Sequence, residues 1–386
     1  SSELNISVVI NRSDEAKALN ALHEAFFLSD TKELHLFMIG VGLIGSTLIE
    51  QVKAQAAFLK EKRGLELRIV GLANSRKMLF QEDGIDLDHW REALSACEVN
   101  MDPAIFVGKM KEMNLSNTIF VDNTASDQVT AYYEDILDSS IPISTPNKIA
   151  ISSGFAQYQR LKAIAAKRDV QFLYETNVGA GLPVISTLND LIISGDRILK
   201  IEGVVSGSLS FIFNNFKVGT RFSDIVKQAQ ELGYTEPDPR VDLNGLDVQR
   251  KLIILSRETG LPMEASDVEI ENILPQACQQ AETVEAFFAE LEKADDTFDE
   301  LRQEAEQEEK ALRMVASLDN GNARISLQKV DSNHPFYSLS GSDNMIVFTT
   351  ERYKERPLVV RGPGAGAEVT AAGVFAEIIT IGNYLA

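Results

Sequence analysis

The sequence predicts an α/β protein with a doubly wound parallel sheet in its first half and a second, mixed α/β domain after it. From Glu33 to about residue 175, strand-like apolar runs alternate with amphipathic helical segments, a pattern typical of a parallel sheet covered by helices. A glycine-rich turn follows the first of these runs directly. After Gly181 the alternation becomes irregular, which indicates that a second domain begins there.

A helix with apolar residues at Leu48, Val52 and Leu59 follows the first strand. Ligands bind such sheets beyond the carboxyl ends of the strands. We therefore expect a binding edge at the turns that follow the strands, at 40, 73–74, 122–124 and 146–148. The strands themselves are predicted at ELHLFMI (33–39), LELRIVGLA (65–73), NTIFVDN (117–123), IPIST (141–145) and VQFLYE (170–175).

The remaining segments are more ambiguous. Residues 4–10 and 13–27 predict one strand and one capped helix, which are too few elements to form a core. The acidic, helical residues 264–313 predict a solvated helix pair. Strand-like runs return at 323–330 and 344–351, and the chain closes with a strand, a glycine-rich turn and a helix, as in a nucleotide-binding domain. The predicted division is 1–30 as a remnant, 31–180 plus 355–386 as the first domain, and 181–354 as the second.

The composition excludes several classes of protein. A formal net charge of −20 over 386 residues argues against nucleic-acid or anionic-membrane partners, because both require a basic face. Nothing resembles a signal peptide or a membrane-spanning run. Cys97 and Cys278 are the only cysteines, so the chain builds neither a disulfide framework nor a thiolate zinc site. We therefore expect a cytoplasmic protein.

The segment Gly40-Val-Gly42-Leu-Ile-Gly45 follows a strand and opens a helix, as in a Rossmann-type dinucleotide site, with a glycine-rich turn that binds no ligand as the alternative. In such a site Gly40 permits the tight turn, Gly42 allows the pyrophosphate to approach the backbone, and Gly45 allows close packing. NAD enzymes usually carry an acid at the end of the second strand. This chain has Asn74 there, followed by the two cations Arg76 and Lys77, which favours the 2′-phosphate of NADP over NAD unless these cations only cover the surface.

The segment 229–251 (AQELGYTEPDPRVDLNGLDVQRK) carries several acids and a lysine on a Gly- and Pro-rich loop that enters a helix. Asp247 and Lys251 are four residues apart on that helix and share one face. A lysine beside carboxylates suggests a proton donor in a site for a cationic substrate, with a solvated acidic loop as the alternative.

Two further segments suggest ligand contacts. Lys148, in the sequence TPNK, ends a strand where it can reach a nicotinamide and a substrate, although a surface lysine is the alternative. Glu175 precedes a glycine-rich turn whose carbonyl oxygens could hold a monovalent cation. The four histidines show no metal-ligand spacing, and neither cysteine lies in the context of a nucleophile.

These motifs resemble the homoserine dehydrogenase family, and specifically the carboxy-terminal half of bifunctional aspartokinase–homoserine dehydrogenases. The family pattern of an alanine, a glycine four residues on, a DP, a D-hydrophobic-x-G-x-D and a lysine is matched between Ala229 and Lys251. Residues 1–27 look like the end of the ACT regulatory region that closes an aspartokinase, which implies an aspartokinase domain in the parent chain. The resemblance covers residues 33–386 and includes VDNTAS, TPNK, ETNVGAGLP, VSGSLSFI and GPGAGAEVTAAGVFAE.

The resemblance implies reversible reduction of L-aspartate 4-semialdehyde to L-homoserine by NADPH or NADH, in a homodimer formed through the second domain. Lys251 would donate the proton, and Lys148 would assist at the substrate oxygen and the cofactor. Glu236 and Asp247 would bind the substrate ammonium, with Asp242 in support. The remaining implied positions are Gly42, Thr124, Gly233 and Gly366 at the cofactor, and Glu175 with the carbonyls of Val178, Ala180 and Leu182 at a sodium ion.

Two other functions remain open. A regulatory module that holds a nucleotide without chemistry predicts no turnover of the semialdehyde with NADPH. A different oxidoreductase on the same nucleotide fold predicts turnover with another amino-acid aldehyde or imine. Activity with L-homoserine against a panel of amino and hydroxy acids separates these readings.

Overall fold

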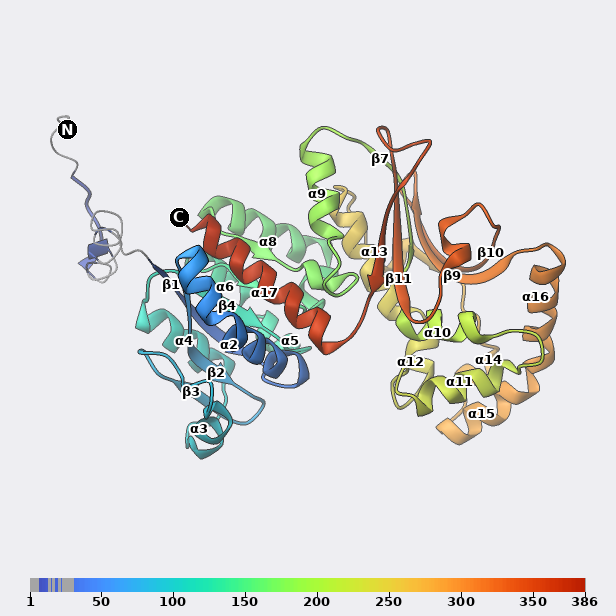
Figure 1. Cartoon of the computed structure of the whole chain (residues 1–386), viewed down its shortest axis with the longest axis horizontal. Helices are drawn as coiled ribbons and strands as arrows, with labels where there is room; N and C mark the ends of the chain where they lie inside the picture. The colour runs from blue at the N-terminus through green and yellow to red at the C-terminus, as the bar shows by residue number, and fades with distance from the viewer. Residues whose placement is uncertain (1–6, 13–14, 16–17, 20–21, 23–30, 386) are drawn as a thin grey trace. The chain divides into compact units, whose positions relative to one another are not determined.

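The computed structural model describes residues 7–12, 15, 18–19, 22 and 31–385, which divide into two compact units (Figure 1). Unit 1 holds the described residues up to Ala150 together with Gln159–Tyr174 and the last residues from Val374. Unit 2 holds Ile151–Tyr158 and Glu175–Gly373. The chain therefore crosses between the units four times.

The sheet of unit 1 has the strand order β3-β2-β1-β4-β5-β6, in which every neighbouring pair is parallel except β2 and β3. Its central strand β1 is buried from residue 34 to its end, as expected for a strand covered on both faces. The strands are β1 (Lys32–Ile39), β2 (Leu65–Ala73), β3 (Met78–Phe80), β4 (Thr118–Asp122), β5 (Ile143–Ser144) and β6 (Phe172–Leu173). The doubly wound sheet that the sequence predicts is confirmed, with an antiparallel edge strand that it did not predict.

The helices of unit 1 begin and end at recognisable signals. Asp102 accepts hydrogen bonds from the first N–H groups of α4, and Pro103 follows it. Gly64 ends α2 with φ of 60°, a conformation that glycine adopts without strain. The helices are α2 (Leu43–Arg63), α3 (Trp90–Ala96), α4 (Pro103–Met113), α5 (Asp127–Thr130), α6 (Tyr133–Asp138), α7 (Ile149–Ser152) and α8 (Phe155–Arg168), of which α7 and α8 cross into unit 2.

Unit 2 contains a second six-stranded sheet, of order β12-β11-β7-β9-β10-β8. Neighbouring strands are antiparallel except β8 and β10. Figure 1 shows that green β7 joins orange and red strands from far later in the chain. The strands are β7 (Ile198–Val204), β8 (Val268–Ile270), β9 (Ala311–Asp319), β10 (Asn322–Val330), β11 (Asp343–Thr350) and β12 (Leu358–Pro363).

Helices and short 3-10 turns complete unit 2. A buried apolar cluster packs between β7, β9, β10 and β11 and the turn η4, and includes Val315, Phe336 and Val347. The elements are η2 (Glu175–Asn177), α9 (Ile185–Ile193), α10 (Gly207–Asn215), α11 (Phe222–Glu231), α12 (Arg240–Leu243), α13 (Leu246–Glu258), η3 (Ala265–Asp267), α14 (Gln276–Gln279), α15 (Val284–Lys293), α16 (Asp295–Gln307) and η4 (Pro335–Ser338). A last helix, α17 (Ala367–Tyr384), begins in unit 2 and ends in unit 1.

Three sequence-based predictions are corrected. The final strand, β12, pairs with β11 in the second sheet, so the return to the first unit comes at Val374 and not at residue 355. The acidic helical segment ends at Gln307, and Ala311–Asp319 is a strand. The strand predicted at 4–10 is not formed at 7–10, the part of it that the structure describes. Most of the helix predicted at 13–27, and with it the proposed remnant, lies outside the described residues.

Candidate active site

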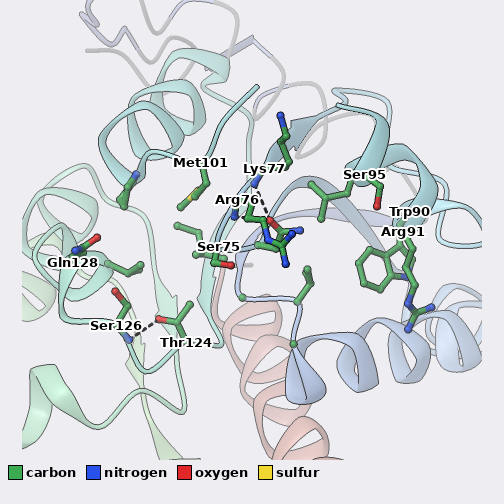
Figure 2. A pocket seen from close by; sticks show the side chains of 18 residues that line it. Ser75, Arg76, Lys77, Trp90, Arg91, Ser95, Met101, Thr124, Ser126 and Gln128 are labelled. Carbon is green, nitrogen blue, oxygen red and sulfur yellow. Dashed lines mark hydrogen bonds between the residues drawn. The ribbon is translucent and has the colours of Figure 1, made fainter. Parts of the chain in front are cut away.

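A cavity of about 1000 Å³ opens at the carboxyl edge of the sheet in unit 1. Five of the predicted cofactor residues line it, namely Gly40, Gly42, Asn74, Arg76 and Thr124. Figure 2 shows Ser75 and Arg76 between the helix that carries Trp90 and Arg91 and the loop that carries Thr124 and Ser126. Three of the four predicted turns therefore line one cavity in this unit, and the turn at 146–148 is not among its lining residues.

The glycine-rich turn has the geometry that a dinucleotide needs. Gly40 has φ of 93°, and a side chain on it would lie 2.8 Å from the backbone of Asn123. A side chain on Gly45 would lie 2.0 Å from the carbonyl oxygen of Gly40. Apart from Gly42 and its two chain neighbours, no atom of the described residues lies within 4 Å of the position where Gly42 would carry a Cβ, so the start of α2 is open to an anionic group. Gly40 thus permits the tight turn, Gly45 permits close packing of the turn against the helix, and Gly42 leaves room for the anionic group.

The turn after β2 distinguishes two neighbouring cations. Oδ1 of Asn74 accepts the backbone N–H groups of Arg76 and Lys77, both at 2.8 Å, and so fixes the turn. The Lys77 ammonium donates to Glu98 O at 3.2 Å and to Asn100 Oδ1 at 3.1 Å. Within the described part of the chain, no such partner holds the Arg76 guanidinium, which leaves it available to an anion in the cavity.

The sequence did not single out Trp90 and Arg91 on α3, which line the same cavity. The Arg91 guanidinium carbon lies 4.4 Å from the centre of the Trp90 ring, over its face. An aromatic residue next to a cation was the available signal. It carries little weight without the knowledge that α3 packs near the end of β2.

The second group of predicted residues lies in unit 2, around the start of α13. Lys251 is only 8 % exposed. Its Nζ lies 2.7 Å from Oδ2 of Asp247 and donates to Val205 O at 2.6 Å. The predicted pairing of these residues across one turn is confirmed. Asp247 is half exposed, so its carboxylate can also reach a ligand from solvent.

Asp242 connects three segments of this site. Oδ1 accepts the hydroxyl of Ser208, at the start of α10, at 2.9 Å, and Oδ2 accepts the N–H of Glu236 at 2.9 Å. Burial raises the pKa of the Asp242 carboxyl, and the nearby charge of Asp247 adds to the rise. These contacts suit the supporting role that the family resemblance implied. Glu236 itself is exposed on the loop.

The remaining predicted residues have separate settings. Lys148 lies in unit 1, and Gly233 and Gly366 lie in unit 2 with φ of 74° and 123°. Both oxygens of the Glu175 carboxylate accept backbone N–H groups at the start of α9, from residues 184–186, at 2.6 to 2.8 Å. The turn after it has left-handed residues at Gly179 and Ala180. The ligand atoms that this turn offers are all oxygens, which suit a hard cation such as sodium. The Glu175 carboxylate, however, already accepts the N–H groups at the start of α9.

The described residues show neither a metal-binding cluster nor a membrane-spanning helix. They contain no cluster of three or more His, Cys, Asp or Glu side chains placed to hold a metal ion. None of their helices is both long and apolar enough to cross a membrane.

Two family profiles match the chain. The profile described as homoserine dehydrogenase, NAD binding domain, matches residues 40–175, and the profile described as homoserine dehydrogenase matches residues 183–379. The second match confirms that the acidic loop and α13 belong to the family's own domain. The first contains the glycine-rich turn and the cavity.

Related proteins support the same family assignment. The chain is 45 % identical over 387 residues to a chloroplastic bifunctional aspartokinase/homoserine dehydrogenase 2 of Zea mays, with 100 % of this chain and 42 % of that protein covered. It therefore spans less than half of that relative's length. It is 41 % identical over 358 residues to a homoserine dehydrogenase of Schizosaccharomyces pombe, with 90 % of this chain and 95 % of that protein covered.

Solved structures share the fold. A protein of unknown function from Candida auris superposes with a TM-score of 0.85 at 36 % identity, over 92 % of this chain and 99 % of the other. A hyperthermophilic archaeal homoserine dehydrogenase in complex with NADPH superposes with a TM-score of 0.71 at 24 % identity, over 91 % and 98 %. Because both domains match the family's profiles and the fission-yeast enzyme aligns over nearly its whole length, this chain belongs to the homoserine dehydrogenase family.

Proposed function

We propose that this chain catalyses the reversible reduction of L-aspartate 4-semialdehyde to L-homoserine with a nicotinamide cofactor, and that Lys251 donates the proton. The observation that carries the role of Lys251 is its buried ammonium, held by Val205 O and Asp247. An ammonium has three N–H donors, and these two contacts leave one for a substrate oxygen. A positioned acid of this kind contributes roughly 10²–10⁴-fold to the rate.

Transfer of a hydride to carbon and of a proton to oxygen reduces the aldehyde to the alcohol. When bound, the cofactor supplies the hydride, which forms the new C–H bond at the aldehyde carbon. The carbonyl π-electrons move to oxygen, and Lys251 transfers a proton to that oxygen. Asp247 and Glu236 would hold the substrate's ammonium, because paired carboxylates favour a cation. Lys148 would assist at the substrate oxygen and the cofactor, as the family resemblance implies.

For the cofactor we propose NADP, with NAD as the alternative. The support is Asn74 in place of the usual acid, and the guanidinium of Arg76, which lines the cavity and has no hydrogen-bond or ion-pair partner among the described residues. We also propose a sodium ion at the turn after Glu175, held chiefly by the carbonyl oxygens of Val178, Ala180 and Leu182, because the Glu175 carboxylate already accepts three N–H groups.

The proposed partners are an aspartokinase domain in the same protein and a second copy of this chain. The bifunctional relatives support an aspartokinase domain in the parent protein. The family resemblance also implies a homodimer formed through the second domain, and light scattering measures whether the chain is a dimer.

The test of the function is NADP⁺ reduction with L-homoserine against a panel of other amino and hydroxy acids. We expect L-homoserine to be the preferred substrate of the panel. Preference for another member would replace the proposal with a different oxidoreductase. Cofactor binding without turnover of any member would favour a regulatory module.

A further inference from the structure

Asn147 connects two loops at the edge of the sheet in unit 1. It is 2 % exposed and immediately precedes Lys148. Its Nδ2 donates to Oδ2 of Asp122 at 3.0 Å and to the carbonyl oxygen of Ser126 at 3.1 Å. Asp122 ends β4, and Ser126 lines the cofactor cavity. One amide group thus joins the TPNK turn to the loop on the cofactor side.

Asp122 is the fixed point of this arrangement. It is fully buried, and it accepts the N–H of Thr124 at 2.8 Å and the hydroxyl of Tyr133 at 2.7 Å in addition to Asn147. Burial raises the pKa of the Asp122 carboxyl, and the hydrogen bonds oppose that rise. Thr124 lines the cofactor cavity. A single carboxylate therefore positions the cofactor loop and the TPNK turn together.

The same bonds immobilise the backbone on both sides of Lys148. The N–H of Asn147 donates to Oγ1 of Thr145 at 2.9 Å. The N–H of Ile149 donates to Oδ1 of Asn147 at 3.1 Å. The main chain is thus held immediately before and immediately after Lys148.

We propose that Asn147 is a positioning residue that holds Lys148 and the Thr124–Ser126 loop in a fixed relation, through its bonds to Asp122 and to Ser126. This inference rests on the proposed function, in which Lys148 assists at the substrate oxygen and the cofactor. A network that only stabilised the fold would act equally whether or not Lys148 carried its ammonium. A positioning network acts through Lys148, so its effect on turnover disappears when Lys148 is removed.

The experiment is a double-mutant cycle on kcat, with Asn147→Ala, Lys148→Ala and the double variant assayed at saturating NADPH. We expect Asn147→Ala to lower kcat about 10- to 100-fold, because a displacement of about 1 Å has this order of effect. In the Lys148→Ala background the same change should lower kcat by less than about twofold. Equal losses in both backgrounds would show that Asn147 acts on the fold alone and would overturn the proposal.

The matched control is Thr118→Val, which removes a buried hydroxyl that donates to Leu115 O at 2.8 Å, at the opposite end of β4 from Asp122. It should lower thermal stability and leave kcat within about twofold. A loss in Thr118→Val as large as that in Asn147→Ala would also count against positioning. Full turnover in Lys148→Ala would remove the proposed role of Lys148, and this inference with it, while the assignment of Lys251 would stand. If Asn147→Ala does not fold, Asn147→Ser replaces it in the same cycle.

Discussion

Lys251 and Asp247 are one helical turn apart, yet their variants should fail in different ways. Lys251→Ala removes the proposed acid from the transition state, so it should lower kcat at least ~10²-fold with little change in cofactor affinity. Asp247→Ala removes the proposed charge-assisted contact to the substrate ammonium, of about 1.5–3 kcal/mol, so it should chiefly raise the KM for the semialdehyde. Some loss of turnover will accompany it, because Asp247 also contacts Lys251 at 2.7 Å.

Steady-state kinetics over a range of semialdehyde concentrations, at saturating NADPH, measure both effects, with circular dichroism to confirm folding. Near-normal turnover in Lys251→Ala would mean that the proton comes from Lys148 or from water, and would contradict the assignment of Lys251 as the proton donor.

Arg76 and Lys77 form a natural pair of test and control for cofactor choice. The Arg76 guanidinium faces the cavity, whereas the Lys77 ammonium is bound to Glu98 O and to Asn100. Arg76→Ala should therefore raise the KM for NADPH at least tenfold more than the KM for NADH, because only NADPH carries the 2′-phosphate. Lys77→Ala should change both constants alike. Equal effects of Arg76→Ala on the two cofactors would contradict the 2′-phosphate assignment.

At the scale of residues, the sequence was informative where the contact is local. The pairing of Asp247 with Lys251 follows from helical periodicity alone, and the structure confirms it. The contacts of Asp122 with Asn147, 25 positions away, depend on which strands are neighbours in the sheet. No periodicity in the sequence reports that neighbourhood, and so this network was not predicted.

Among the elements, the start of α9 tests what Glu175 does. Its carboxylate accepts three N–H groups there, a favourable arrangement for an anion at a helix N-terminus. Glu175→Gln should lower the free energy of unfolding by about 1.5–3 kcal/mol. Urea unfolding in NaCl and in KCl measures this loss, which we expect to be the same in both salts. A loss confined to NaCl would make the carboxylate itself the principal sodium ligand.

Element types were predicted best where the pattern was long and its ends were marked. The predicted loop does enter a helix: the run LDVQRKLIILSRE forms α13, because Gly245, with φ of 77°, opens it and the apolar face continues to its end. The strand β12 was assigned to the wrong sheet. The segment made of β12, the glycine-rich turn after it and α17 has the local pattern of a nucleotide-binding domain. Only the pairing of β12 with β11 shows that this strand belongs to the second sheet.

For the whole molecule, salt should have opposite effects on stability and on cofactor affinity. The net charge of −20 repels itself at low ionic strength, while the cofactor cavity carries Arg76, Lys77 and Arg91. Raising KCl from 10 to 150 mM shortens the screening length from about 30 Å to about 8 Å. The melting temperature should therefore rise by a few degrees, and the KM for NADPH should rise as well. A cofactor KM that fell with salt would mean that the overall charge outweighs the local cations.

The last helix, α17, has a consequence for how the chain is made. Its carboxy-terminal part belongs to unit 1, where Glu377 accepts a hydrogen bond from Ser144 and Lys32 donates to the carbonyl oxygen of Gly382 at 3.2 Å. A ribosome releases these residues only after all of unit 2 has emerged. Unit 2 can thus finish folding first, whereas unit 1 cannot complete its fold until α17 has been synthesised. Nascent chains stalled before Val374 should on this account expose the apolar surface that this helix covers, and depend on chaperones until translation resumes.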